Sequence, residues 1–135
     1  MEAINEFVPP IHQIVADEEL KFIHLLNVLG SIYETDGNLQ RIVILTLQDR
    51  TARNLSALLT QHYVRVTSVS GSRKPKRKRR ATNGFDSGRF QVLIISQSGL
   101  DVETGEISHF INYDIQLPYP AINNSNIRGR NRRHG

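Results

Sequence analysis

Two segments of the sequence concentrate arginine and lysine densely enough to bind phosphate groups. The first, "RKPKRKRR" at positions 73–80, holds seven basic residues in eight positions. The second supplies Arg128, Arg130, Arg132 and Arg133. Outside these segments six Lys and Arg residues face thirteen acidic ones, so the net charge of +4 conceals a negative remainder. Positive charge concentrated in this way is typical of a binding site for anions.

Further polar residues follow two apolar stretches of the sequence. Arg130 and Arg133 are three residues apart, so in a helical turn they share one face, and paired guanidinium groups suit phosphate oxygens. The turn "SQSGLDVETGE" offers Gly99 and the carboxylate of Asp101. The arginine pair indicates half of a site for a nucleotide phosphate or a nucleic-acid backbone. A basic tail without a ligand remains the alternative.

Several other kinds of chemistry are not expected. Without cysteine the chain has neither disulfides nor Cys-ligated zinc, and its five histidines lack the spacing of metal ligands. It contains no GxxxxGK[ST] phosphate loop and no nucleophile beside a base, so we expect no nucleotide hydrolysis by this chain alone. No apolar run approaches the roughly 18 residues that cross a bilayer, and the first residues do not form a secretory signal.

The elements that must position these residues alternate in type along the chain. Apolar residues at helical spacing predict helices, and short β-branched runs predict buried strands. The predicted helices cover 17–33 and 49–62, and the predicted strands cover 41–46, 64–69, 90–96 and 109–118. This alternation predicts one α/β domain over 1–135, with a mostly parallel sheet and helices on both faces.

The first basic segment lies between two predicted strands, where a crossover helix must return the chain. Ala81 and Phe85 are four residues apart and would form the buried edge of that helix. Because so many like charges repel one another, such a helix is easier to explain with an anion bound against it. The alternatives are a solvated surface and a nuclear import signal.

Together these segments resemble the second, C-terminal RecA-like lobe of the DEAD-box family of superfamily 2 RNA helicases. The likeness runs from about His12 to Gly135. "RIVILTLQDRTARNLSALL" is similar to motif IV and its helix, "VLIIS" with "GLDV" to motif V, "FINYDIQLP" to the Val-Ile-Asn-Tyr-Asp strand, and "NIRGRNRR" to motif VI. "SGSRKPKRKRRATNGFDSG" matches the segment that begins His-Gly and ends Phe-x-Ser-Gly. The chain ends directly after motif VI, whereas lobes of this family continue, so we expect a truncated lobe.

The resemblance implies roles for the matching positions. Arg130 and Arg133 would face the nucleotide γ-phosphate, with Arg133 as the arginine finger, and would be catalytic only when paired with a first lobe. Gly99 and Asp101 would lie on the nucleotide side, and Gly71, Lys78 and Ser96 along the path of the RNA backbone. This lobe would hold no cofactor and no metal itself, whereas ATP and magnesium would bind the full-length protein.

The departures from the family pattern are also informative. Motif V is short by three residues, and Ser98 replaces its arginine. Gln48 replaces the threonine of motif IV, and Asn126 replaces the Gln or His that opens motif VI. Pro75 and Lys78 replace the Gln-x-x-Arg pair. Directed contacts to RNA are therefore lost, while bulk positive charge is added at the same place. The predicted RNA-binding residues are Gly71, Arg73, Lys74, Lys76, Arg77, Lys78, Arg79, Arg80 and Ser96.

Three functions follow as hypotheses. The first is a non-catalytic lobe that binds single-stranded RNA, in small-RNA (piRNA) biogenesis and RNA-mediated gene silencing, since the drifted motifs resemble the Yb-type Tudor-domain proteins. The second is the lobe of an active ATP-dependent RNA helicase, which supplies the arginine finger to a first RecA-like lobe in the same protein. The third is a scaffold for protein partners. We expect no membrane partner, and a location in the cytoplasm, in ribonucleoprotein granules, with the nucleus as the alternative.

Overall fold

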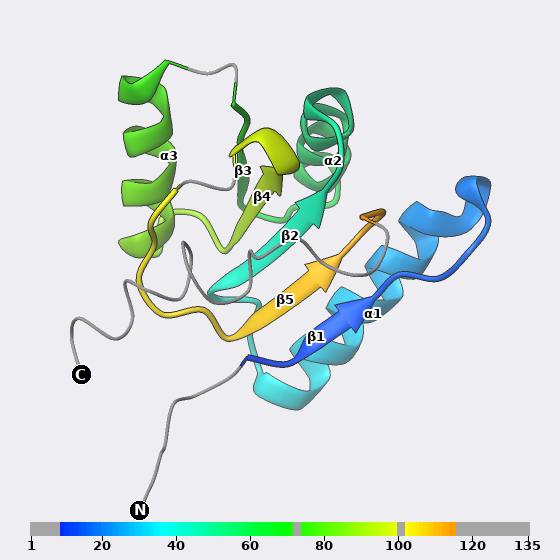
Figure 1. Cartoon of the computed structure of the whole chain (residues 1–135). Helices are drawn as coiled ribbons and strands as arrows, with labels where there is room; N and C mark the ends of the chain where they lie inside the picture. Colours follow the sequence, from blue (N-terminus) through cyan, green and yellow to red (C-terminus); the bar gives the residue numbers. More distant parts are fainter. Residues whose placement is uncertain (1–8, 72–73, 100–101, 116–135) are drawn as a thin grey trace, which may run out of the picture.

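A five-stranded parallel sheet forms the centre of the domain, in the strand order β1-β5-β2-β4-β3 (Figure 1). The computed structural model describes residues 9–71, 74–99 and 102–115. Within them, every strand pairing is parallel, as the sequence predicts. The strands are β1 (Ile11–Gln13), β2 (Ile42–Thr46), β3 (Val66–Val69), β4 (Val92–Ser96) and β5 (His109–Asn112).

The two central strands are buried along their whole length. Every residue of β2 and β4 is buried, and the alternation of side chains divides them between the two faces of the sheet. Ile42 and Ile44 enter the hydrophobic core on one face, and Val43 and Leu45 enter the core on the other. Continuous β-branched runs of this kind are typical of parallel strands covered on both sides.

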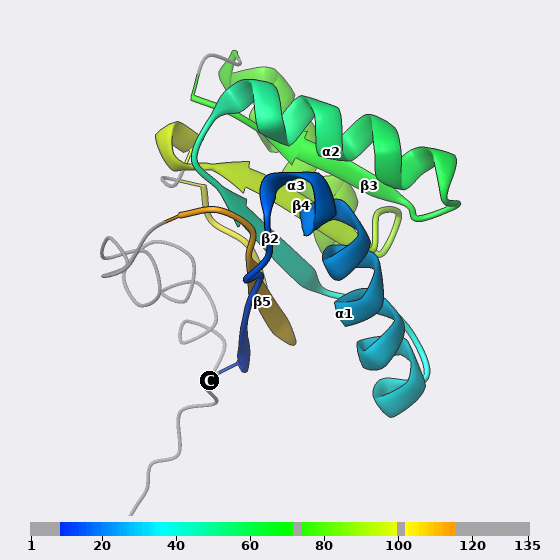
Figure 2. The ribbon, with the colours of Figure 1, turned by 90° about the vertical axis from the view of Figure 1, so that its right-hand side faces the viewer.

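Helices α1 (Lys21–Asp36) and α2 (Asp49–Gln61) cover one face of the sheet (Figure 2). Leu25, Leu29 and Ile32 of α1 are buried in that core. The predicted start of α1 at position 17 was wrong, because Glu18–Leu20 form a separate 3-10 turn. Gly37 ends α1 in the left-handed conformation (φ 80°), and its N–H donates to the Tyr33 carbonyl oxygen.

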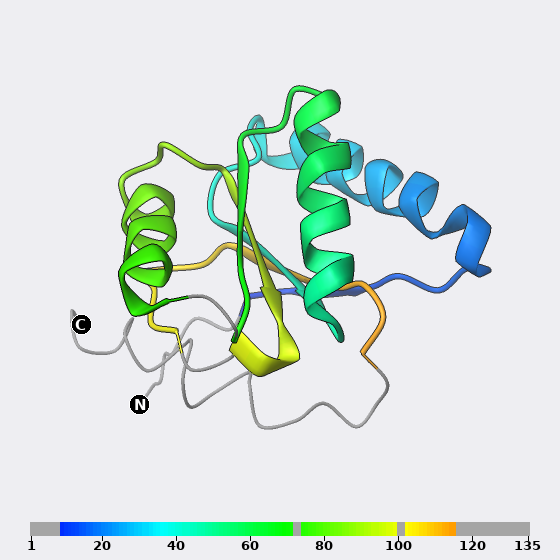
Figure 3. The ribbon, with the colours of Figure 1, turned by 90° about the horizontal axis from the view of Figure 1, so that it is seen from above.

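From Pro75 onward the basic segment forms the first half of helix α3 (Pro75–Asp86), which covers the opposite face of the sheet (Figure 3). Ala81 and Phe85 are buried against that face, as predicted, and Phe85 is among the largest fully buried side chains. Pro75 occupies the first turn, where its fixed φ suits a helix start. The sheet therefore carries helices on both faces, and the described part of the basic segment is folded.

Strand β1 and the end of β5 differ from the sequence predictions. β1 was not predicted, although it pairs with β5 from Ile11↔Phe110 to Gln13↔Asn112. The strand predicted over 109–118 ends at Asn112, because the Asn112 side chain closes a turn. Its Oδ1 accepts from the Ile115 N–H (2.8 Å) and its Nδ2 donates to the Ile115 carbonyl oxygen (2.7 Å). Positions 116–118 lie outside the described residues.

A single arginine, Arg41, attaches the end of α3 to the sheet. Its Nη1 donates to the Phe85 carbonyl oxygen (2.8 Å), and its Nη2 lies 3.1 Å from the Asp86 carboxylate. The guanidinium carbon lies 4.3 Å from the centre of the Phe85 ring. On the other side, the Arg41 Nε donates to the Glu106 carbonyl oxygen. These contacts fix the position of α3 relative to the strands.

Candidate nucleic-acid interface

Hydrogen bonds among Asp49, Ser96 and Ser98 join the start of α2 to the carboxyl end of β4 and the turn that follows it. The Asp49 carboxylate, in the first turn of α2, accepts from the Ser96 hydroxyl (2.5 Å) and from the Ser98 hydroxyl (2.9 Å). The two serine hydroxyl oxygens lie 3.2 Å apart. Ser96, which was predicted to line the RNA path, is fully buried in this arrangement.

Two glycines lie close to the same strand ends. The Gly71 N–H donates to the Ser98 hydroxyl (3.1 Å), and a Cβ at Gly71 would lie 2.5 Å from the Ser98 carbonyl oxygen. Gly99 is buried over the end of β3, where a Cβ would lie 3.1 Å from the Val69 carbonyl oxygen. The shortened motif V turn therefore packs directly on the end of β3. The backbone N–H of Gly71 has a partner within the protein.

Carboxylates place negative charge at the carboxyl ends of the strands. Asp114 accepts from the Thr46 hydroxyl and from the Leu47 N–H, each at 2.8 Å. Burial raises the pKa of Tyr113, and the nearby charges of Glu18 and Asp114 raise that pKa further. With Asp49, these groups disfavour a phosphate at the strand ends. The polar groups at these strand ends therefore make contacts within the chain.

Helix α3 carries the opposite charge. Lys76, Arg77, Arg79 and Arg80 are exposed and Lys78 is half-buried, while the first turn contains no acidic residue. Like charges three or four residues apart on a helix repel one another, and cations are unfavourable near the positive end of the helix dipole. The charges of the four exposed residues therefore do not stabilise α3. Their positions are those that would neutralise an anion bound along the helix.

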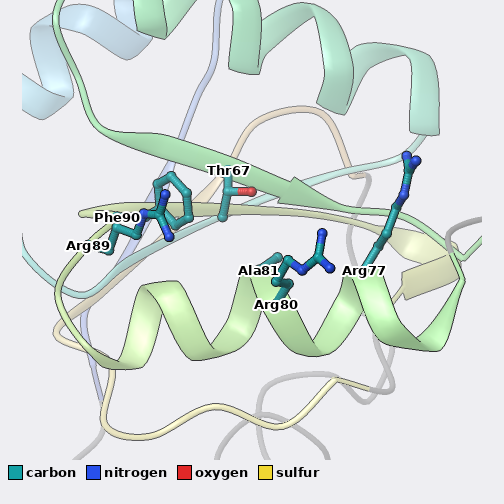
Figure 4. A pocket seen from close by; sticks show the side chains of 6 residues that line it. All are labelled: Thr67, Arg77, Arg80, Ala81, Arg89 and Phe90. Carbon is teal, nitrogen blue, oxygen red and sulfur yellow. The ribbon is translucent and has the colours of Figure 1, made fainter.

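Two hollows flank α3. On the side of edge strand β3 lies a hollow of about 310 Å³, here called the arginine groove, lined by Thr67, Arg77, Arg80, Ala81, Arg89 and Phe90 (Figure 4). The hollow on the other side, about 360 Å³, is lined by Pro75, Lys78, Arg79, Thr82, Asn83, Val102 and Glu103. The arginine groove thus carries three cations and no lining acid, whereas Glu103 offsets the charge of the other hollow.

The structure gathers the predicted residues into two groups. Gly71, Ser96 and Gly99 lie together at the strand ends, and Lys74, Lys76 and Arg77–Arg80 lie along or just before α3. Arg73, Asp101, Arg130 and Arg133 lie outside the described residues, so their roles stay predictions. The sequence reasoning missed Asp49, Asp114, Arg89 and Phe90. For Asp49 the available signal was a carboxylate that follows a buried strand and begins a helix.

Other kinds of site are not found in the part of the chain that the structure describes. There, no three or more His, Asp or Glu side chains are grouped so as to hold a metal ion. Among the described residues, no helix is long and apolar enough to span a membrane.

Comparison with known proteins relates this geometry to a family. No protein-family model matches the sequence. The chain is 32% identical over 113 residues to the pre-mRNA-processing ATP-dependent RNA helicase prp5 of Emericella nidulans, which covers 78% of the chain and 9% of that helicase. The chain spans 9 to 15% of the length of the curated relatives that it matches first.

Solved structures give the same relationship for the fold. The C-terminal domain of the DEAD-box protein Dbp5 superposes with a TM-score of 0.71 at 22% identity, covering 95% of this chain and 71% of that one. S. cerevisiae Dbp5 bound to RNA and ADP BeF3 gives a TM-score of 0.65 at 23% identity, covering 84% of this chain and 28% of that one. In fold and in sequence similarity, the chain corresponds to the C-terminal RecA-like lobe of DEAD-box RNA helicases.

Proposed function

We propose that this domain binds single-stranded RNA through phosphate contacts made by α3, and that it is not catalytic on its own. The observation that carries the proposal is the placement of exposed cations on a folded, sheet-covering helix that they do not stabilise. The relatives are RNA helicases, and one structural neighbour is bound to RNA, which supports RNA as the anion. Because the contacts are to phosphate, binding should be largely indifferent to base sequence.

Salt dependence tests the proposal directly. Each neutralised phosphate releases counterions, so the logarithm of the binding constant should fall by about 0.7 per contact for each tenfold rise in salt. We expect fluorescence polarisation with a labelled oligouridylate to show this steep decline. Charge reversal of Arg77, Lys78, Arg79 and Arg80 to Glu should abolish binding.

A control pair lies on α2, where Arg50 and Arg53 are exposed and three residues apart. Arg50→Glu/Arg53→Glu should retain most of the affinity while also lowering the net charge. Binding that ignores both salt and the reversal on α3 would refute the proposal. A loss that is equally large in the α2 control would show attraction to net charge alone.

A second function, the C-terminal lobe of an active ATP-dependent helicase, is supported by the relatives, which are ATP-dependent RNA helicases. In that case the full-length protein would bind ATP and magnesium, and Arg133 would stabilise the charge of the transition state, worth about 10³ to 10⁵ in rate. The test is RNA-stimulated ATPase activity of a longer chain that includes a first lobe, with Arg133→Ala. Unchanged ATPase activity in Arg133→Ala would exclude this role.

The biological setting is a narrower proposal. The drift of motifs IV, V and VI from the DEAD-box pattern supports a place among Yb-type helicase-like proteins of small-RNA (piRNA) biogenesis, in cytoplasmic ribonucleoprotein granules. Fluorescence microscopy of the tagged full-length protein checks the location, and a nuclear signal would favour the import reading of the basic segment. Small-RNA sequencing after deletion of this domain checks the pathway, and unchanged piRNA levels would contradict it.

A further inference from the structure

We propose that the RNA strand runs along the flank of α3 in the arginine groove, with its phosphates on Arg77, Arg80 and Arg89 and a base against Phe90. This inference rests on the RNA-binding function proposed above and assigns it a position. It moves the strand away from the carboxyl ends of the sheet. Figure 4 shows Arg77 and Arg80 on the β3 side of α3, and Arg89 beside Phe90 at the far end of the hollow.

The first support is the unpaired charge of the groove. Among the described residues, none of its three arginines takes part in an ion pair, and no acidic side chain lines the groove. Guanidinium groups are always charged at neutral pH, and their fixed donors match phosphate oxygens. Three such groups around one hollow of about 310 Å³ suit a ligand that carries phosphates.

The second support is an aromatic surface within the groove. The half-buried Phe90 ring packs on α3 at Gly84, where a Cβ would lie 2.6 Å from the ring. The Arg89 guanidinium lies 5.7 Å from the centre of the ring. A cationic groove with an aromatic ring is the arrangement by which proteins bind single-stranded nucleic acid without reading its sequence.

The third support is that the polar groups at the carboxyl ends of the strands already bond to one another. There Asp49 and Asp114 carry negative charge, and the Ser96 hydroxyl and Gly71 N–H are already bonded within the chain. A phosphate at that edge would have to displace these bonds and approach the carboxylates. The arginine groove, in contrast, has no acidic residue in its lining.

The arginines of the groove are spread along the length of α3. Helix α3 has 12 residues, about 18 Å at 1.5 Å per residue, and Arg77 lies in its first turn while Arg89 follows its end. Helix α3 runs back alongside β3, so the three arginines lead from the carboxyl ends of the strands toward their amino ends (Figure 4).

An acidic peptide is the main competing ligand. Among the described strands, β3 pairs with β4 alone, so a partner strand could add to its other side. RNA fits better because three arginines line the hollow, while its apolar lining is limited to Ala81 and Phe90 and offers no row of pockets for the alternating side chains of a peptide strand. The experiment below separates the two ligands.

Two double variants of the full chain, matched in charge and both on α3, test the position of the RNA. Arg77→Ala/Arg80→Ala should weaken oligouridylate binding at least tenfold and reduce the salt slope by about 1.4, the value for two single-strand phosphate contacts. Lys78→Ala/Arg79→Ala, in the other hollow, should weaken binding threefold at most. Circular dichroism verifies that both variants keep the wild-type fold.

Equal losses of affinity in the two variants would contradict the placement of RNA in the arginine groove. The proposal that α3 binds RNA would still stand. No binding by the wild-type chain would refute the proposed function itself. Phe90→Leu should cost about fivefold or more, because it removes a stacking surface and keeps an apolar side chain beside Gly84. Unchanged affinity in this variant would contradict the base contact.

Crosslinking gives a measurement that does not depend on variants. RNA that contains 4-thiouridine should, on irradiation, attach to the peptide around Phe90, and mass spectrometry locates the adduct. An adduct near Ser96 instead would return the RNA to the strand ends and overturn the inference. Preferential binding of polyglutamate over oligouridylate at equal charge concentration would also overturn it, in favour of an acidic protein partner.

Discussion

The polar groups at the two outer strands of the sheet, β1 and β3, differ in whether they have partners within the protein. At one edge, β1 is tied to β5 by side chains: the Asn112 Nδ2 donates to the Gln13 Oε1 (3.1 Å), and ring nitrogens of His12 and His109 lie 3.0 Å apart. The Asp36 carboxylate lies 2.6 Å from the other ring nitrogen of His109. At the other edge, β3 faces the arginine groove, where the described charged groups are without such partners.

This contrast separates structural polar groups from groups that are free to bind a ligand. A polar side chain that is buried and hydrogen-bonded stabilises the fold, because its removal leaves its partner without a hydrogen bond. Exposed like charges on one helix oppose folding slightly and gain favourable interactions only with an anion. Substitutions at the β1 edge should therefore change stability, and substitutions in the groove should change binding. The predictions below test that division.

The largest expected effect concerns the aromatic ring that α3 buries against the sheet. Phe85→Ala should lower the free energy of unfolding by about 3–5 kcal/mol, because it removes a fully buried ring from the core under α3. Urea denaturation followed by circular dichroism measures the change. Phe85→Leu is the control and should cost less than about 1.5 kcal/mol. Similar stabilities of Phe85→Ala and the wild type would mean that α3 does not pack on the sheet as described.

The second prediction concerns the β1 edge. Asn112→Ala should cost about 1–3 kcal/mol, because it leaves the buried N–H and carbonyl of Ile115 without their side-chain partner. Urea midpoints again measure the change. Gln13→Ala removes the acceptor of the Asn112 Nδ2 on β1 but leaves the Asn112–Ile115 turn in place, so it should cost clearly less. If both variants are equally unstable, the bond between β1 and β5 matters more than the turn after β5.

Local sequence patterns were sufficient for most of this fold. The apolar runs that became β2 and β4, and the pair Ala81 and Phe85 that faces the sheet, could be predicted because burial imposes a period on neighbouring residues. Strand β1 could not be predicted. It has three residues, two of them exposed, and it is held by pairing with β5 about a hundred positions later.

The site was less accessible from the sequence than the fold was. Asp49 has the position of an ordinary acidic residue at a helix start, and its bonds to Ser96 and Ser98 depend on β2 and β4 being neighbours in the sheet. Similarly, Arg89 joins Arg77 and Arg80 only because the chain turns back at the end of α3. The number of cations was evident from the sequence, but their division between two hollows was not.

The third prediction is a pH dependence at the β1 edge. Burial lowers the pKa of His12 below 6.5, and the nearby His109 lowers it further. A histidine whose pKa is lower in the folded state contributes stability that is fully present above pH 6.5 and is lost as the pH falls through its folded pKa. The melting temperature should therefore drop between pH 7.5 and 5.5. His12→Gln should show a smaller drop, and an equal drop in this variant would assign the effect to other groups.

The smallest expected effect has the opposite sign. Arg77→Ala/Arg80→Ala should leave the melting temperature unchanged or raise it slightly, because it removes the repulsions between 74 and 77, 77 and 80, and 76 and 80. Each such pair on a helix costs about 0.2–0.5 kcal/mol, and alanine also favours the helix. Differential scanning calorimetry at low salt, where the repulsion is least screened, gives the best sensitivity. A clear loss of stability would mean that these arginines hold α3 to the sheet. It would contradict the view that the charged groups beside β3 serve binding rather than folding. A gain in stability together with a loss of RNA affinity would show that the groove is kept at the expense of the fold, as expected of a surface selected for its ligand.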